Sequence, residues 1–150
     1  MQRTHGEDSP LLRIIGRRRS IRRFLDTPLE RDMILSCLEA ARLAPSAENA
    51  QPWRFLVIDD PEVKARFCRE AFSGLYGRTR FAERAPALIL ILSRTEFRTH
   101  ALGRQLQGIS FQLIDIGIAG EHLVLRAAEL GLGSCWIGWF HTRRARRFFR

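Results

Sequence analysis

Apolar residues along the chain fall into groups at helical spacing and into short continuous runs, with prolines and glycines between them. Ser9 followed by Pro10 supplies an N-cap and a first-turn residue, which predicts a short helix over 10–16. A basic connection over 17–23 follows this helix. The chain therefore starts with a helix that leads directly into a cluster of arginines.

A second helix is predicted from the sequence Thr27-Pro28-Leu29-Glu30. Thr27 and Glu30 have the spacing of a capping box, and Pro28 suits the first helical position. The helix should end at about Ala44, because Pro45 disfavours helical geometry in the residue before it. Its expected apolar face consists of Met33, Cys37, Ala40, Ala41 and Ala44.

Two strands and a third helix are predicted in the middle of the chain. Residues 53–58 lie between a proline and an Asp-Asp-Pro turn, as is typical of a strand. Residues 61–72 have apolar positions at helical spacing, and 73–84 read as a polar, glycine-containing loop. The continuous apolar run 87–92 indicates a strand that is covered on both faces.

The longest apolar stretch, 106–130, is too long for a strand and predicts a mostly buried helix. Residues 134–140 are expected to form a third strand, and 142–150 a basic helix. The small residues that would let the long helix pack closely against its neighbours are Gly117, Ala119 and Gly120.

Composition favours one globular domain over residues 1–150. The chain is 45% hydrophobic and 27% charged, which suits one core and argues against disorder. The alternation of helices with a few strands predicts an α+β fold with three layers, α/β/α. A long helix that is apolar nearly all round needs more cover than this chain offers, so a dimer is expected.

The charge is strongly positive. There are 25 basic residues against 16 acidic ones, a net charge of +9, and Lys64 is the only lysine. Arginine has a planar fork of donors that suits phosphates and carboxylates, so an anionic ligand is plausible. A solvated basic surface would give the same composition.

The remaining composition limits the class of protein. Three widely separated cysteines outside any CxxC pair argue against a disulfide framework and against a zinc site. The first ten residues are polar and hold no signal peptide. We therefore expect a soluble, cytoplasmic protein, since the long apolar stretch also contains Asp115, Glu121, His122 and Arg126.

Three segments are candidates for chemistry. Arginines and Ser20 within 17–24 suit a phosphate dianion, although by composition alone a solvated turn or a nucleic-acid surface fits this segment better. The stiff loop 44–53 offers uncharged amides and a hydroxyl for the polar edge of a heterocycle, or it is an ordinary capped turn. In 131–140, Gly138 indicates a bulge or a close approach of backbone to a flat ligand, or an accident of packing.

Taken together, the three segments resemble those of the nitroreductase family of flavoproteins. Members carry Arg-Arg-Ser-x-Arg-x-Phe, then Pro-Ser-x-x-Asn-x-Gln-Pro-Trp, then a long helix ending in Ala-x-x-Leu-Gly-Leu-Gly-Ser-Cys-Trp-Ile-Gly. The order and spacing agree over residues 11–140. The matching positions are Arg18, Arg19, Ser20, Arg22, Phe24, Pro45, Ser46, Asn49, Gln51, Pro52, Trp53 and 127–138.

This resemblance implies a nitroreductase-like fold, with a central mixed sheet flanked by helices, and a homodimer with FMN at each subunit interface. NAD(P)H would deliver hydride to the flavin, which would pass it to a nitroaromatic, a quinone or a similar electron-poor compound. No catalytic side chain and no metal is implied. The implied cofactor-binding residues are Arg18, Arg19, Ser20 and Arg22 for the phosphate and ribityl chain, Pro45, Ser46, Ala47, Asn49 and Gln51 from the other subunit, and Ile137 and Gly138 near the ring.

The sequence departs from the family pattern in four places. Ala47 stands where a second serine is common, His122 where asparagine is common, and Trp139 where a small residue is frequent. The sequence also stops at Arg150, before the C-terminal strand and arm that members usually have. Related branches of the family reductively dehalogenate aromatic compounds or cleave flavin itself, and the resemblance leaves these enzyme activities open as alternatives.

Two alternatives to a reductase remain open at this point. A basic nucleic-acid-binding domain would use 17–23 and 143–150 against a phosphate backbone, but Trp53, Trp136 and Phe140 are expected in core strands rather than among the arginines. A degenerate family member would keep the fold without reductase activity.

Overall fold

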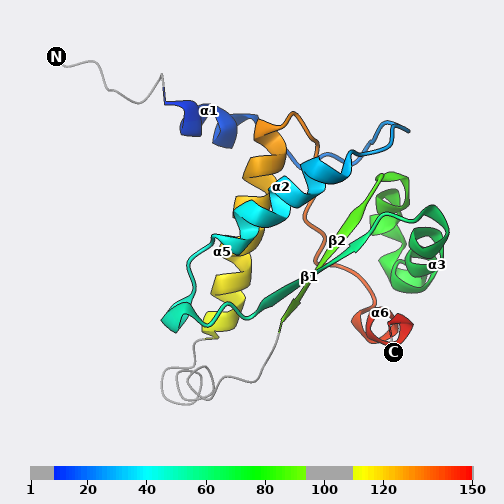
Figure 1. The fold of residues 1–150 in the computed structure, drawn as a ribbon. Coiled ribbons are helices and arrows are strands. Elements are labelled where there is room, and N and C mark those ends of the chain that lie inside the picture. The colour runs from blue at the N-terminus through cyan, green and yellow to red at the C-terminus, as the bar shows by residue number, and fades with distance from the viewer. Residues whose placement is uncertain (1–8, 94–109, 150) are drawn as a thin grey trace.

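The structure, a computed structural model, describes residues 9–93 and 110–149. A small sheet lies between two groups of helices, with α2 and α5 on one side and α3 and α6 on the other (Figure 1). The elements in chain order are α1 (Pro10–Arg17), α2 (Arg31–Arg42), the 3-10 helix η1 (Ala47–Asn49), β1 (Trp53–Ile58), α3 (Pro61–Ala71), the 3-10 helix η2 (Gly74–Arg84), β2 (Leu88–Ser93), α5 (Phe111–Glu129) and α6 (Thr142–Phe148).

Strands β1 and β2 pair antiparallel, from Trp53 opposite Ser93 to Ile58 opposite Leu88. Successive side chains of a strand point to opposite faces, so each strand contributes to two cores. Phe55 and Ile91 pack on the α5 side, whereas Ile58 and Leu88 pack on the α3 side. This arrangement confirms the predicted three-layer α+β class.

Two hydrophobic cores hold the layers together. The larger one joins α3, η2 and α6 to the sheet, and the smaller one joins α5 and the end of α2 to the sheet. Phe67 of α3 is 1% exposed and Ala119 of α5 is fully buried. The buried members are Ile58, Phe67, Cys68, Ala71, Phe72, Ala82 and Ala145 in the first core, and Ala44, Trp53 and Ala119 in the second.

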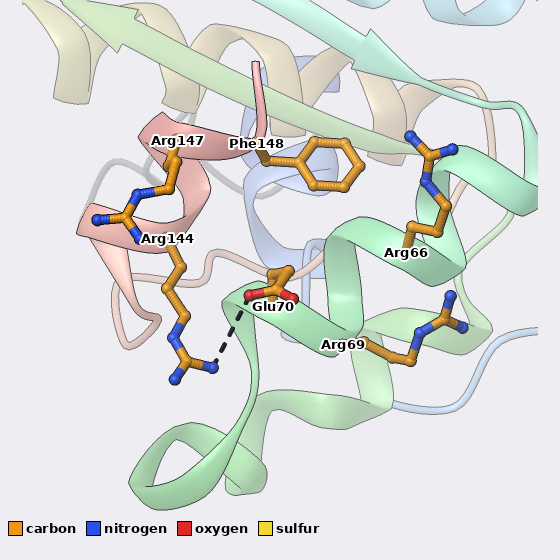
Figure 2. Close-up of a pocket in the computed structure, with 6 residues that line it drawn as sticks. All are labelled: Arg66, Arg69, Glu70, Arg144, Arg147 and Phe148. Atoms are coloured by element: carbon orange, nitrogen blue, oxygen red, sulfur yellow. Dashed lines mark ion pairs between the residues drawn. The ribbon is translucent and has the colours of Figure 1, made fainter. Parts of the chain in front are cut away.

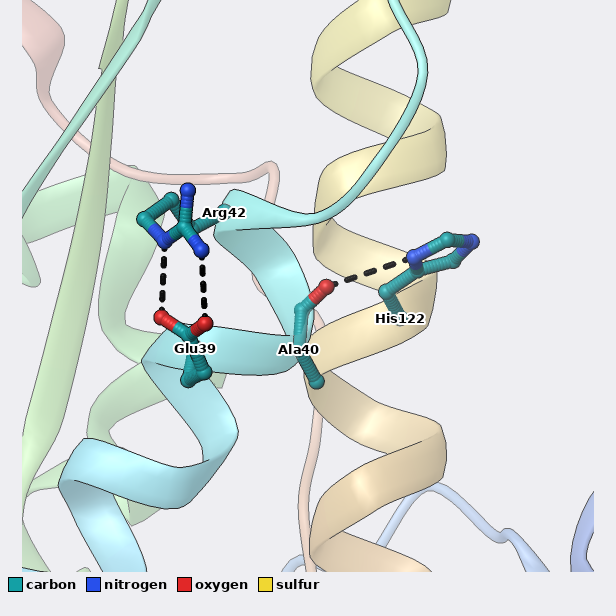
Figure 3. A network of polar contacts seen from close by, with 4 residues as sticks. All are labelled: Glu39, Ala40, Arg42 and His122. Atoms are coloured by element: carbon teal, nitrogen blue, oxygen red, sulfur yellow. Dashed lines mark hydrogen bonds and ion pairs between the residues drawn. The ribbon is translucent and has the colours of Figure 1, made fainter.

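Polar side chains of α5 cross to α2 and add directional contacts to the apolar packing. His122 Nδ1 lies 3.3 Å from the carbonyl oxygen of Ala40, to which it donates when that nitrogen is protonated (Figure 3). Arg126 Nε donates to Ser36 Oγ at 2.9 Å. Histidine at this position thus ties the two helices together.

Gly120 of α5 is required by a close approach from the segment that follows the helix. A Cβ atom at this position would lie far inside van der Waals contact of the Trp136 indole ring. Gly117, one turn earlier, faces open space. The predicted close packing of α5 therefore holds at Gly120 but not at Gly117.

The predicted start of the second helix is wrong. Helix α2 begins at Arg31, and Glu30 is its N-cap, with no side-chain cap bond. The Glu30 carbonyl oxygen instead accepts hydrogen bonds from the N–H groups of Met33 and Ile34 at 3.1 and 3.4 Å. A capping box contributes only about 1 kcal/mol, so the extended path of the chain before the helix outweighs it.

The predicted third strand is also wrong. Of residues 134–140, only Ser134 makes a sheet-like contact in the described chain, an isolated parallel bridge with Ser20. A strand needs a neighbour for its backbone groups, and the sheet of the described residues has just β1 and β2. The apolar residues Ile137 and Phe140 serve the α3-side core instead.

The predicted loop 73–84 is helical, because its side chains have tertiary partners. Thr79 Oγ1 donates to the carbonyl oxygen of Trp139 at 2.9 Å, and Tyr76 packs on the Trp139 ring with centroids 5.2 Å apart. The other helices and strands match their predictions within about two residues where they are described, whereas 106–109 and Arg150 lie outside the described residues. None of the helices in the described part is long and apolar enough to cross a bilayer.

The Gly120–Trp136 contact yields a stability prediction. Gly120→Ala should lower the free energy of unfolding by about 1–3 kcal/mol, because the indole must leave its position. Gly117→Ala on the same helix is the matched control and should raise it by about 0.5–1 kcal/mol through helix propensity. Urea denaturation followed by tryptophan fluorescence measures both. Equal effects of the two substitutions would contradict the assignment.

Candidate functional site

The arginine segment after α1 is docked against the glycine-rich segment that follows α5. The Ile21 N–H group donates to the carbonyl oxygen of Ser134 at 2.9 Å. The Ile21 side chain packs over Gly133, where a Cβ atom would come within 3.1 Å of it. The first and third candidate segments, far apart in sequence, are therefore neighbours in space.

The arginines of this segment differ in how far their charge is compensated. Arg18 Nε lies 3.5 Å from Glu121 Oε1 of α5, and its side chain is 32% exposed. Arg19 and Arg22 bond only to backbone carbonyl oxygens in the described chain, at 2.6–3.4 Å. Both guanidinium groups thus keep an unneutralised charge at the surface, as an anion site requires.

The loop after α2 has a strained backbone. Glu48, Asn49 and Gln51 have φ angles of 54°, 53° and 44°, which is the left-handed region that residues other than glycine avoid. Each such residue costs on the order of 1 kcal/mol and persists only where surrounding contacts hold it. The contacts around the loop must therefore hold it in this shape.

Hydrogen bonds hold the loop in this shape. Ser46 Oγ accepts from the N–H group of Gln51 at 2.9 Å, and Gln51 Nε2 donates to Asn49 Oδ1 at 3.2 Å. Both amide side chains are exposed. Among the described contacts, Asn49 Nδ2 and Gln51 Oε1 are not used, so the loop presents a donor and an acceptor to the outside.

Asp115 of α5 fixes the other end of this loop. Its Oδ1 atom accepts a hydrogen bond from the N–H group of Ala47 at 3.0 Å. The side chain is 2% exposed, and its Oδ2 atom has no hydrogen-bond partner in the described structure. This role of Asp115 was not predicted from the sequence, although an acidic residue within a buried apolar helix is a signal for it.

The third segment does not form a packed strand, and its backbone at Gly138 is open, that is, exposed and free of close contacts within the described chain. Gly138 is exposed, and a Cβ atom there would meet nothing within 4 Å, so packing within the chain does not require glycine. Ile137 is half-buried against the α3-side core. Trp136 is 46% exposed, so its predicted place in a core strand is wrong, since only part of the indole lies against Gly120.

Helix α5 separates the strained loop from the arginine segment. The loop contacts α5 at Asp115, near the start of the helix, whereas Arg18 contacts it at Glu121 and Ile21 contacts the chain beyond its end. Figure 1 shows α1 and η1 at opposite ends of α5. One chain therefore brings together the first and third segments but not the second.

Two of the three cysteines are unsuited to act as nucleophiles, because the pKa values of their thiols are raised. Burial raises the pKa of the Cys37 thiol, and burial together with the Glu83 carboxylate raises the pKa of Cys68 to about 11. Both remain protonated at neutral pH and contribute packing rather than reactivity.

Comparison with known proteins identifies relatives over most of the chain. A model of the nitroreductase family matches residues 15–77 and 69–150. A protein of Archaeoglobus fulgidus whose name pairs NADH dehydrogenase with NAD(P)H nitroreductase is 35% identical over 127 residues, which are 85% of this chain and 66% of that protein. The chain spans about 60–66% of the length of this and a second archaeal relative.

Solved structures agree in fold. A nitroreductase family protein from Clostridium novyi is 27% identical and superimposes with a TM-score of 0.79, over 93% of this chain and 75% of that one. An FMN-dependent nitroreductase from Clostridium difficile is 30% identical with a TM-score of 0.67, over 91% of this chain and 74% of that one. The three-layer arrangement is thus shared with solved members of that family.

The Asp115 contact can be tested by stability measurements. Asp115→Ala leaves the Ala47 N–H group without its acceptor and should cost about 1–3 kcal/mol of unfolding free energy. Asp115→Asn keeps an acceptor oxygen and removes a buried charge, so its stability should stay within about 1 kcal/mol of the parent. Urea denaturation distinguishes the two. An asparagine variant as unstable as the alanine variant would refute an unpartnered Oδ2.

Proposed function

Because the chain belongs to the nitroreductase family, we propose that it is an FMN-dependent oxidoreductase that uses NAD(P)H to reduce a small, electron-poor organic compound such as a nitroaromatic or a quinone. The observation that carries the proposal is the docking of Arg19–Arg22 against Ser134, which sets uncompensated guanidinium groups in the same region as an open glycine-containing backbone. We further propose that residues 1–150 act as one cytoplasmic domain.

The chemistry of the donors fits FMN. Arg18, Arg19 and Arg22, with the Ser20 hydroxyl, would hold the phosphate through charge-assisted hydrogen bonds. The open backbone at Ile137 and Gly138 would lie along the flat ring. When bound, FMN supplies the hydride chemistry between NAD(P)H and the acceptor, and the protein supplies binding and orientation.

The amides of the strained loop would meet the polar edge of the ring. Asn49 and Gln51 are held by the Ser46 and Asp115 contacts before any ligand arrives, so little conformational entropy is lost on binding. Pro45 and Ala47 belong to the same fixed loop. The backbone strain at Asn49 and Gln51 is typical of residues that are kept for ligand contact.

A homodimer would complete the site. Because α5 separates the loop from the arginines, both can reach one FMN if the loop comes from a second subunit. The first turn of α5 also carries Leu113 and Ile114, which are 68% and 50% exposed. Apolar residues of this size on a surface helix are typical of a subunit interface.

The structure favours this function over nucleic-acid binding. A duplex or single strand would have to contact the arginines before Ile21 and those of α6 at once, but α1 and α6 lie at opposite ends of the molecule in Figure 1. The exposed, uncharged amides of Asn49 and Gln51 also have no role in counterion-driven binding. The alternative that experiments must exclude is a family member that keeps the fold but lacks reductase activity.

The shared site predicts complementation between two damaged subunits. Arg18→Ala should weaken FMN binding by about 1.5–3 kcal/mol, and Asn49→Asp, which tolerates the left-handed backbone, should cost about 1 kcal/mol or more. After subunit exchange, a mixture of the two variants should regain tight FMN binding at about a quarter of its sites, because half of the dimers are mixed and each holds one undamaged site. Fluorescence titration of FMN measures the fraction.

The control for this experiment mixes Arg18→Ala with Arg22→Ala, which damage the same half of the site. This mixture should regain nothing. Recovery in neither mixture, or a monomer that binds FMN tightly in sedimentation, would rule out a site shared between subunits. Riboflavin, which has no phosphate, should bind the parent and Arg18→Ala equally.

The proposed activity predicts a colour change. Purified protein should carry or take up yellow FMN, and NADH or NADPH without an acceptor should bleach it. A quinone or a nitroaromatic should then restore the colour, with parallel lines in steady-state kinetics, because both substrates use one site in turn. Stopped-flow absorbance follows both half-reactions. Bound flavin that neither nicotinamide reduces would point to a degenerate member.

A further inference from the structure

A groove of about 660 Å³ lies between α3 and α6, on the other side of the sheet from the proposed flavin site. Its lining residues come from these two helices. Figure 2 shows two arginines on each side, with a carboxylate and an aromatic ring between them. The lining consists of Arg66, Arg69, Glu70, Arg144, Arg147 and Phe148.

The groove has an excess of three positive charges. Its single carboxylate, on Glu70, lies 3.8 Å from Arg144 Nη1, which also donates to Ser73 Oγ at 3.1 Å. Arg69 and Arg147 are exposed and have no carboxylate partner among the described residues. Like charges gathered around one concavity repel each other, and a bound anion of matching charge relieves this repulsion.

The groove has a fixed apolar base. The Arg66 guanidinium lies over the Phe148 ring, 5.5 Å from its centroid. Phe148 in turn packs edge-on against the buried Phe67, with centroids 5.6 Å apart. At least one arginine is thus held in place by stacking, so less entropy is lost when it binds a ligand.

We propose that this groove binds a small polyphosphate anion, that is, a ligand with two or more linked phosphate groups. Four guanidinium forks on two sides of one carboxylate suit several phosphates better than a single one. The volume of the groove lies in the range of small-molecule sites. The ligand could be free polyphosphate or the phosphate chain of a nucleotide, which share this chemistry.

The test measures binding of tripolyphosphate, ATP and adenosine by calorimetry, using FMN-saturated protein at about 150 mM salt, where surface attraction is screened. Tripolyphosphate and ATP should bind, and adenosine should not. The double variant Arg69→Glu/Arg147→Glu should weaken both by at least about tenfold. Arg31→Glu reverses one charge at an exposed arginine outside the groove, at the start of α2; it is the control and should change the affinity less than about twofold.

Each outcome decides the proposal. Equal affinities for ATP and tripolyphosphate support a polyphosphate source, and tighter ATP binding that Phe148→Leu weakens supports a nucleotide source. Loss of binding in Arg19→Glu/Arg22→Glu but not in the groove variant would overturn the proposal, as would an equal loss in Arg31→Glu. Tighter binding of a single-stranded oligonucleotide than of either probe would also overturn it. The FMN affinity of the groove variant should be unchanged. A failure of the groove proposal can therefore be distinguished from a failure of the proposed flavin site.

Discussion

Helix α5 packs against α1, α2, η1 and β2, and these contacts position the arginine segment and the strained loop of the proposed flavin site. At Gly120 of this helix, the Trp136 ring occupies the space that a side chain would need. Trp136 lies between Ser134, which pairs with the arginine segment, and the open backbone at Gly138. A shift of α5 would therefore move the phosphate donors and the open backbone together.

The loop after α2 depends on the same helix in a different way. Its left-handed residues are unfavourable by themselves, and the fixed acceptor on Asp115 helps to hold them. The buried carboxylate is itself unfavourable, because one of its oxygens has no partner in the described structure. The left-handed backbone and the buried carboxylate both lower the stability of the fold. Together they fix the side chains of Asn49 and Gln51 at the surface, as a binding loop would require.

The arginines of the chain serve different purposes at different places. Arg126 ties α5 to α2 through Ser36, and Arg18 is paired with Glu121. Arg19, Arg22, Arg69 and Arg147 are among those without a carboxylate partner in the described chain. Arg19 and Arg22 belong to the proposed flavin site, whereas Arg69 and Arg147 line the groove on the other side of the sheet, so the chain has two separate candidate anion sites.

The sequence by itself determined the elements whose signals are local. Periodicity and caps predicted α1, β1, α3 and β2 closely, and the resemblance in three motifs predicted the fold. Tertiary structure decided the start of α2, the absence of a ladder at 134–140, the strain of the loop at Asn49 and the role of Asp115. Hydrogen bonds within a helix join near neighbours, but strand pairing, strain and convergent charges depend on residues that are distant in the chain. Such partners become known only when the chain has folded.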